Sequence, residues 1–150
     1  MTKEETQESG FILIVEDDRG TSELEALRLE FLGLEIRRAS TPAETLEILK
    51  SARPELMVLD YSFPDMNAFE LLAGLKANSI PVPPFIMVTG RGDETVAVES
   101  MKAGALDYIA KAASFLENLL PTAKKALEKA ALQFKLKKAE EGQRKNLRLY

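Results

Sequence analysis

The sequence predicts an α/β fold, in which helices cover both faces of a doubly wound five-stranded parallel sheet. Short apolar runs that indicate buried strands recur along the chain, and a weaker run alternates as an edge strand does. Segments with helical spacing separate these runs, and such alternation favours a parallel sheet. The 150 residues, 45% apolar and 29% charged, suit one globular domain. The runs are FILIV (11–15), LMVL (56–59), FIMV (85–88) and DYIA (107–110), with LEIRRA (34–39) as the edge strand.

The helices between these strands are predicted from their apolar spacing. Over residues 22–32 the sequence SELEALRLEFL places Leu24, Leu27 and Phe31 on one apolar face. The third helix is expected over residues 68–77, AFELLAGLKA, and a long helix is expected to extend the C-terminal end of the chain.

Capping residues mark the ends of the other two helices. Thr41 is an N-cap, with Pro42 at the first helical position and Glu44 placed to complete a capping box. The fourth helix is expected to begin after Asp93 as its cap and to stop at Gly104.

Polar residues follow four of the five predicted strands. In doubly wound sheets, ligands bind beyond the carboxyl ends of the strands, at the point where the strand order reverses. The common order for five strands, the flavodoxin-like 2-1-3-4-5, puts this point between the first strand and the third. The residues at the strand ends are Glu16, Asp17 and Asp18, then Asp60, Thr89 and Lys111.

These residue types favour a Mg²⁺-dependent phosphoryl-transfer site. Clustered carboxylates repel one another unless a cation lies among them. The chain has no histidine and no cysteine, and a ligand set made of oxygen atoms alone suits Mg²⁺. Asp60 can then act as a nucleophile toward phosphorus, while Thr89 and Lys111 hold the phosphoryl oxygens.

The motifs that carry these residues resemble those of a response-regulator receiver domain of two-component signalling. The likeness covers roughly residues 10–130, and the order of the motifs makes it specific. ILIVEDD carries Glu16 and Asp17, LDYSFPDM carries Asp60, MVTG carries Thr89, and DYIAK carries Tyr108 and Lys111.

The resemblance implies a set of metal ligands. Asp17 and Asp60 would bind Mg²⁺ directly, and Glu16 would bind it through water. The backbone carbonyl of Ser62 would complete the protein ligands. Asp18, next to the ligand pair, is expected to point away from the metal.

The resemblance also implies a function. Asp60 would accept a phosphoryl group from a histidine kinase or a histidine phosphotransfer protein, and Lys111 would assist. Thr89 and Tyr108 would then switch the face formed by the fourth helix, the fifth strand and the fifth helix. Such a domain is a cytoplasmic signalling receiver that catalyses only its own phosphorylation and dephosphorylation.

Two departures from the family pattern stand out. Asn67-Ala68 occupies the place of the usual Asp-Gly, so the turn before the third helix is expected to differ. Ala112 follows Lys111 where the family usually has a proline, often with a cis bond. A cis bond before alanine is costly, so a trans bond is expected here.

Charge is divided unevenly along the chain. Residues 1–120 hold 11 Lys+Arg against 21 Asp+Glu, whereas residues 121–150 hold 9 against 3. An acidic body argues against nucleic acid as its partner. No apolar run reaches 18 residues, so no membrane span is expected. The predicted division is a disordered lead-in (1–10), a receiver domain (11–130) and a helical extension or linker (131–150).

The C-terminal stretch suggests a further contact. Pro121 suits the first turn of a new helix better than a helix interior. From there Ala123, Leu127, Ala130 and Phe134 follow the 4-3-4 spacing of a coiled-coil seam. The stretch is therefore interpreted as a solvated basic helix, a connection to an output module, or the contact of a homodimer.

Two alternative functions remain open at this point. A degenerate receiver would act only as a protein-binding module, although every expected site position is filled. A haloacid-dehalogenase-like phosphatase also uses a strand-end aspartate, Mg²⁺ and a lysine. That enzyme needs a second aspartate two residues after its nucleophile, and Ser62 stands there.

Overall fold

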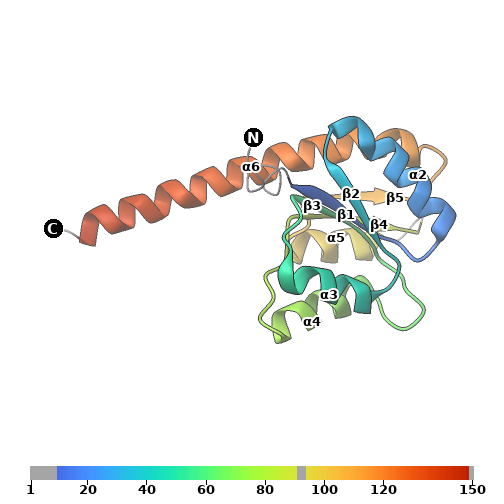
Figure 1. Cartoon of the computed structure of the whole chain (residues 1–150), viewed down its shortest axis with the longest axis horizontal. Coiled ribbons are helices and arrows are strands. Elements are labelled where there is room, and N and C mark those ends of the chain that lie inside the picture. The colour runs from blue at the N-terminus through green and yellow to red at the C-terminus, as the bar shows by residue number, and fades with distance from the viewer. Residues whose placement is uncertain (1–9, 91–93, 149–150) are drawn as a thin grey trace.

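The computed structural model describes residues 10–90 and 94–148 and confirms the predicted α/β class. Five parallel strands form one sheet in the order β2-β1-β3-β4-β5 (Figure 1). The edge strand β2 is the most exposed, as its alternating sequence predicts. The strands are β1 (Phe11–Val15), β2 (Glu35–Ala39), β3 (Leu56–Asp60), β4 (Phe85–Thr89) and β5 (Asp107–Ala110).

Helices cover both faces of this sheet (Figure 1). Successive residues of β1 point to opposite faces, so Leu13 joins one buried cluster and Ile14 the other. Both faces are apolar and buried, as parallel sheets require. One face carries α3 (Pro42–Ser51), α4 (Ala68–Ala77) and α5 (Glu94–Lys102), and the other carries α2 (Arg19–Leu29) and α6 (Phe115–Arg148).

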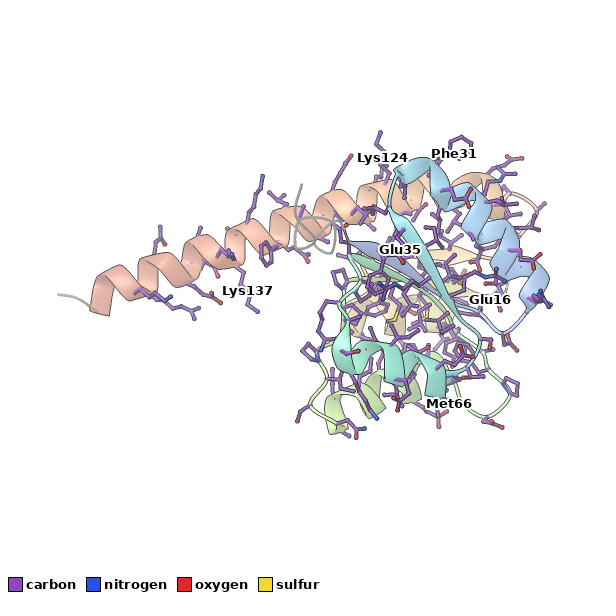
Figure 2. All side chains as sticks on the ribbon, viewed as in Figure 1. Glu16, Phe31, Glu35, Met66, Lys124 and Lys137 are labelled. Carbon is purple, nitrogen blue, oxygen red and sulfur yellow. The ribbon has the colours of Figure 1, made fainter. Side chains whose placement is uncertain are left out.

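The apolar face predicted for the first helix is not its buried face. Leu24, Leu27 and Phe31 are 48%, 58% and 81% exposed, and Phe31, in the 3₁₀ turn η1 (Glu30–Leu32), lies on the outer surface (Figure 2). The helix begins at Arg19, earlier than predicted, and buries a different stripe with the same spacing. That stripe is Ser22, Glu25 and Leu29.

Two helix caps also differ from expectation. The Thr41 hydroxyl accepts from the Glu44 backbone N–H at 3.1 Å, but the Glu44 carboxylate accepts from the Ser40 hydroxyl at 2.7 Å. Only one arm of that predicted capping box is therefore present. A complete box occurs at α4, where the side chains of Asn67 and Glu70 each accept from the other's backbone N–H.

Of the remaining backbone expectations, those for Ala112 and Gly104 are confirmed, and the one for Asp93 cannot be compared with the structure. No peptide bond within the described ranges is cis, so the bond before Ala112 is trans as predicted. Gly104 follows α5 with a φ of +102°, which suits a helix stop. The predicted cap Asp93 lies outside the described residues. No helix within those ranges combines the length and hydropathy of a membrane span.

The prediction that Pro121 lies in the first turn of a new helix is wrong. Pro121 lies inside α6, a single helix of 34 residues. A proline at this position removes the hydrogen bond that the Glu117 carbonyl would accept. Glu117 is exposed, so water can satisfy that carbonyl. The helix therefore continues through the proline.

The predicted coiled-coil seam packs largely against the chain's own sheet. Ala123 is fully buried, and Leu127 and Ala130 are partly buried in the same cluster. Phe134 is 61% exposed. Residues 131–145 are all exposed and project beyond the sheet, with Lys137 on the projecting part (Figure 2). A homodimer could therefore use the full seam only if α6 left the domain.

An acidic site at the carboxyl edge of the sheet

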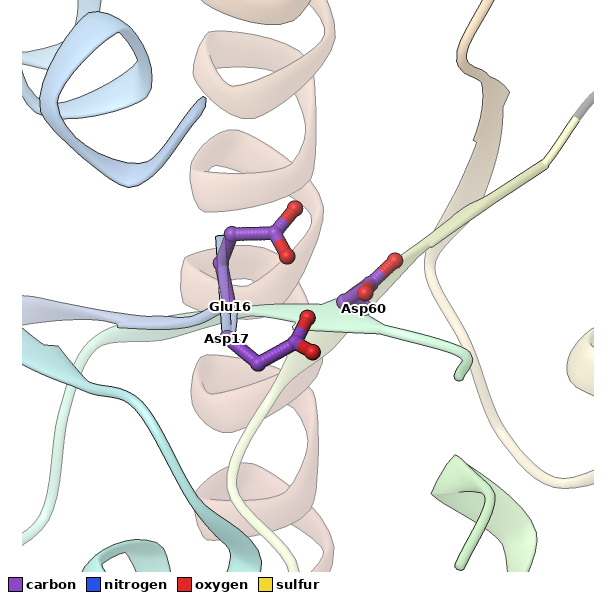
Figure 3. A group of neighbouring side chains, drawn as sticks. All are labelled: Glu16, Asp17 and Asp60. Carbon is purple, nitrogen blue, oxygen red and sulfur yellow. The ribbon is translucent and has the colours of Figure 1, made fainter. Parts of the chain in front are cut away.

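Three carboxylates meet at the carboxyl edge of the sheet (Figure 3). Glu16 and Asp17 follow β1, Asp60 ends the neighbouring strand β3, and one oxygen of each lies within 4.8 Å of the others. The register that pairs Val15 with Leu59 brings these strand ends together. Glu16 and Asp60 are buried, whereas Asp17 is exposed, so the cluster opens to solvent on one side.

Lys111 is the cation of this cluster. Its Nζ donates to Glu16 Oε1 at 2.5 Å and lies 3.2 Å from Asp60 Oδ1. Burial, followed by the charge of Glu16, raises the pKa of Asp60 to about 7. Burial lowers the pKa of Lys111, but the hydrogen bond to Glu16 and the two carboxylate charges outweigh this effect and raise it. The lysine therefore remains charged.

Asp18 has a different task from Asp17. Its Oδ2 accepts from the backbone N–H of Thr21 at 2.8 Å and from the Thr21 hydroxyl at 2.6 Å. These hydrogen bonds cap α2 and hold the pKa of Asp18 below its usual value. The cap thus occupies Asp18 and leaves Asp17 in the carboxylate cluster.

The other candidate residues lie on neighbouring segments of the same edge. Thr89 is buried at the end of β4, and its hydroxyl donates to the Gly90 carbonyl at 2.5 Å. Tyr108 is half-buried in β5 and packs against the apolar core on the face of the sheet that α3 and α4 cover. Ser62 is exposed in the loop after β3 and pairs with Asn67 across that loop. The stretch 91–93 of the loop after β4 lies outside the described residues.

One charged residue near the site was missed by the sequence analysis. Glu25 is only 2% exposed, and its Oε1 has no hydrogen-bond partner. Burial, followed by the charge of Glu16, raises its pKa to about 8. The available signal was its position three residues after Ser22 and four before Leu29, on the stripe that α2 buries.

The donor set fits Mg²⁺. All three clustered ligands are carboxylates, which hard divalent cations prefer, and the chain has no histidine or cysteine to favour a softer metal. Lys111 balances only part of the negative charge. The buried Asp60 carboxylate, next to a cation and open to solvent through Asp17, is suited to nucleophilic attack on phosphorus.

Without Mg²⁺, Asp60→Asn is expected to gain stability relative to the unchanged chain as the pH rises. The pKa of Asp60 is about 7 in the folded chain, whereas the ordinary value of this carboxyl group is 3.8. The folded state thus holds an extra proton between these values, and its stability falls as the pH rises through them. Asparagine does not titrate. Urea denaturation in chelator, at about pH 5 and about pH 8, gives the free energy of unfolding of both chains. The difference between Asp60→Asn and the unchanged chain should shift in favour of the variant by about 2–3 kcal/mol from the lower pH to the higher. An equal difference at both pH values would contradict this pKa.

Comparison with known proteins agrees with this fold. The chain belongs to the response regulator receiver domain family, whose model matches residues 12–124. It is therefore a receiver domain of two-component signalling.

Individual relatives support this assignment. The chain is 34% identical over 101 residues to the phosphate regulon transcriptional regulatory protein PhoB of Pseudomonas aeruginosa, covering 67% of this chain and 44% of PhoB. It is 32% identical over 122 residues to the response regulator MprA of Mycobacterium ulcerans, covering 81% and 52%. The chain thus spans about half the length of these relatives.

One solved structure is matched by this chain over nearly all of the solved structure's own length. The CheY-like response regulator receiver domain protein of Methanospirillum hungatei is 34% identical, with a TM-score of 0.70. The match covers 83% of this chain and 98% of that one. The part of this chain outside the match is small.

Proposed function

We propose that this domain accepts a phosphoryl group on Asp60 in a Mg²⁺-dependent reaction. The observation that carries the proposal is the burial of Asp60 between the Lys111 ammonium and the carboxylates of Glu16 and Asp17. The donor is the phosphohistidine of a histidine kinase or of a histidine phosphotransfer protein. This chain has no histidine of its own to serve as a donor.

The transfer exchanges one bond to phosphorus for another. A carboxylate oxygen of Asp60 bonds to phosphorus, and the bond from phosphorus to the donor nitrogen breaks with its electron pair remaining on nitrogen. Mg²⁺ would neutralise charge on the phosphoryl oxygens. Lys111 leaves its carboxylate partners to bind a phosphoryl oxygen, and the Thr89 hydroxyl leaves the Gly90 carbonyl to bind another.

The proposed metal ligands are three carboxylates and one backbone carbonyl. Asp17 and Asp60 would hold Mg²⁺ directly, Glu16 would hold it through water, and the backbone carbonyl of Ser62 would complete the protein ligands. The carboxylate oxygens of the first three lie close enough to share one ion.

Acetyl phosphate and Mg²⁺ test the proposal without a partner protein. We expect intact mass spectrometry to show one added phosphoryl group, and chelator to prevent its addition. No adduct under any Mg²⁺ concentration would instead support a receiver that acts only by binding proteins. Continuous release of phosphate from a phosphate monoester would support the phosphatase alternative.

We further propose that phosphorylation is transmitted by the face of α5, β5 and α6. Movement of Thr89 toward the phosphoryl group would draw the start of the following loop inward and make room beside β5. Tyr108, now half-buried, would move into that space. The phosphorylated state is favoured only by contacts that it alone makes, here those of Thr89 and Lys111.

Beryllofluoride, a phosphoryl mimic, is expected to reduce the solvent accessibility of Tyr108. Tyrosine fluorescence quenching before and after its addition measures this change, with Tyr108→Phe as the matched control for the other tyrosines. Analytical ultracentrifugation of the same samples measures dimer formation. An unchanged Tyr108 signal would contradict the switch, and an unchanged monomer fraction would contradict the homodimer.

We also infer a division of the chain at the point where α6 loses contact with the sheet. Burial along α6 ends at Ala130, so residues 11–130 form the receiver domain and the following residues form an extension or linker. We propose that this extension meets a second copy or an output module, and that the domain acts in the cytoplasm with its histidine kinase.

A further inference from the structure

Arg38 is a charged residue on the side of β2 that faces α2. Side chains of a strand alternate between the two faces of the sheet, and Ile36 packs into the apolar cluster on the face that α2 covers. Arg38, two residues later, points the same way, and its Nε donates to the Ser22 hydroxyl of α2 at 2.9 Å. Ser22 is only 3% exposed. A buried hydroxyl on the packing stripe of α2 thus anchors the Arg38 guanidinium.

The anchor leaves the outer nitrogen atoms of Arg38 available. Its Nη2 lies 4.0 Å from Glu23 Oε1, and neither Nη atom makes a hydrogen bond to a described residue. Glu23 lies closer to Arg19, whose Nε is 3.2 Å from the same oxygen. Arginine stays charged and presents its N–H groups in a fixed fork that suits a carboxylate or a phosphate. Arg38 therefore offers charged donors that the fold itself does not use.

The Arg38 side chain lines a cavity that adjoins the acidic site. The cavity has a volume of about 420 Å³, and Glu16 and Asp17 line it together with Arg38. The same two carboxylates form the acidic cluster with Asp60. The other charged residues that line the cavity are Arg19 and Glu44. The cavity and the acidic cluster are therefore neighbours that share the Glu16 and Asp17 side chains.

The geometry of phosphoryl transfer directs the leaving group of a donor toward this cavity. The attacking and leaving atoms lie roughly in line through phosphorus, so the leaving group is on the side of phosphorus away from Asp60. Asp60 is buried and Asp17 is exposed, so a donor reaches Asp60 from the side on which Asp17 borders the cavity. Lys111 approaches Asp60 from the opposite flank, that of β5. Arg38 is thus a cation on the side of the leaving group.

We propose that Arg38 is a specificity-determining residue that binds the leaving group of acyl phosphate donors in this cavity. This inference rests on the proposed phosphorylation of Asp60. An Asp60 carboxylate oxygen bonds to phosphorus, and the bond from phosphorus to the acyl oxygen breaks with its electron pair remaining on that oxygen. The carboxylate that leaves gains a negative charge, which the Arg38 guanidinium stabilises. A nitrogen leaving group that departs as a neutral amine or imidazole gains no such charge.

Two small donors that differ in their leaving group test this role. Acetyl phosphate releases acetate, whereas phosphoramidate releases neutral ammonia, and intact mass spectrometry follows the adduct over time at saturating Mg²⁺ and limiting donor. We expect Arg38→Gln to slow the reaction with acetyl phosphate about tenfold, as the loss of a charge-assisted hydrogen bond does, and to leave the rate with phosphoramidate unchanged. Arg37→Gln is the control and should change neither rate. It removes the same charge from the other face of β2, where Arg37 packs over the Phe11 ring outside the cavity.

The comparison of donors separates this role from an effect on the fold or on the metal. The ratio of the two rates in one variant does not depend on the fraction of the protein that is folded. Calorimetric titration of Arg38→Gln with Mg²⁺ should show no loss of affinity, because the change removes a positive charge from beside Glu16 and Asp17. Equal slowing with both donors, or no slowing with either, would overturn the inference and leave the proposed function intact. If the unchanged chain formed an adduct with neither donor, the proposed function itself would fail.

Discussion

Replacing Asp60 with asparagine is expected to abolish phosphorylation by acetyl phosphate or by a histidine kinase. Asparagine keeps the shape of the side chain at the end of β3 but has no carboxylate oxygen to attack phosphorus. The expected loss is complete within the detection limit of intact mass spectrometry. The fold should persist, because the change also removes a buried carboxylate with a raised pKa.

Asp65 offers a matched control for this experiment. It is an exposed aspartate in the loop after β3, so Asp65→Asn should leave the phosphoryl adduct unchanged. An adduct that persists at full yield in Asp60→Asn would show that another residue is the acceptor. The rate in the unchanged chain should also rise with pH through about 7 when Mg²⁺ is limiting, because attack needs the ionised carboxylate.

Replacing Asp17 with asparagine is expected to weaken Mg²⁺ binding at least tenfold, whereas Asp18→Asn should leave it nearly unchanged. Asp17 shares an oxygen cluster with Glu16 and Asp60. Asp18 instead caps α2 through Thr21, and asparagine is an equally good N-cap residue. The loss of Mg²⁺ affinity should therefore depend on which carboxylate is removed, although each variant removes one negative charge.

Isothermal titration with Mg²⁺ measures both variants, and thermal unfolding checks that each remains folded. If Asp17→Asn and Asp18→Asn weakened binding equally, long-range charge alone would explain the effect, and Asp17 would not be a direct ligand. If only Asp18→Asn weakened it, the order of ligands after β1 would be wrong.

The strands and their carboxyl ends could be predicted from the sequence because two simple constraints fix them. A strand buried on both faces needs an unbroken apolar run, as in FILIV and FIMV. Parallel strands all end at one edge of the sheet, so Glu16, Asp60, Thr89 and Lys111 had to gather there once the strand order was known.

The first helix shows where such reasoning fails. The sequence of α2 offers two stripes with helical spacing, and the more apolar one, with Leu24 and Leu27, is exposed. The choice between stripes depends on how the helix packs on the sheet, which helical spacing alone does not state. Glu25 escaped notice because a carboxylate on a helix is ordinarily expected at the surface.

The prediction of a new helix at Pro121 is wrong because it considers only the local conformational preference of proline. Whether a helix tolerates proline depends on what happens to the carbonyl that loses its donor. Glu117, which carries that carbonyl, is an exposed residue of α6. The sequence alone does not state this exposure, which allows water to replace the lost donor.

The unbroken course of α6 through Pro121 gives the domain a mechanical lever. Residues 131–148 of the helix would extend about 27 Å at a rise of about 1.5 Å per residue. If the half against the sheet tilted by about 10°, the far end would be displaced by roughly 5 Å, provided that the helix stays straight. A small tilt of α6 against the sheet would thus displace the far end of the helix by several ångströms. The contact of α6 with the sheet near Ala130 would be the pivot of this motion.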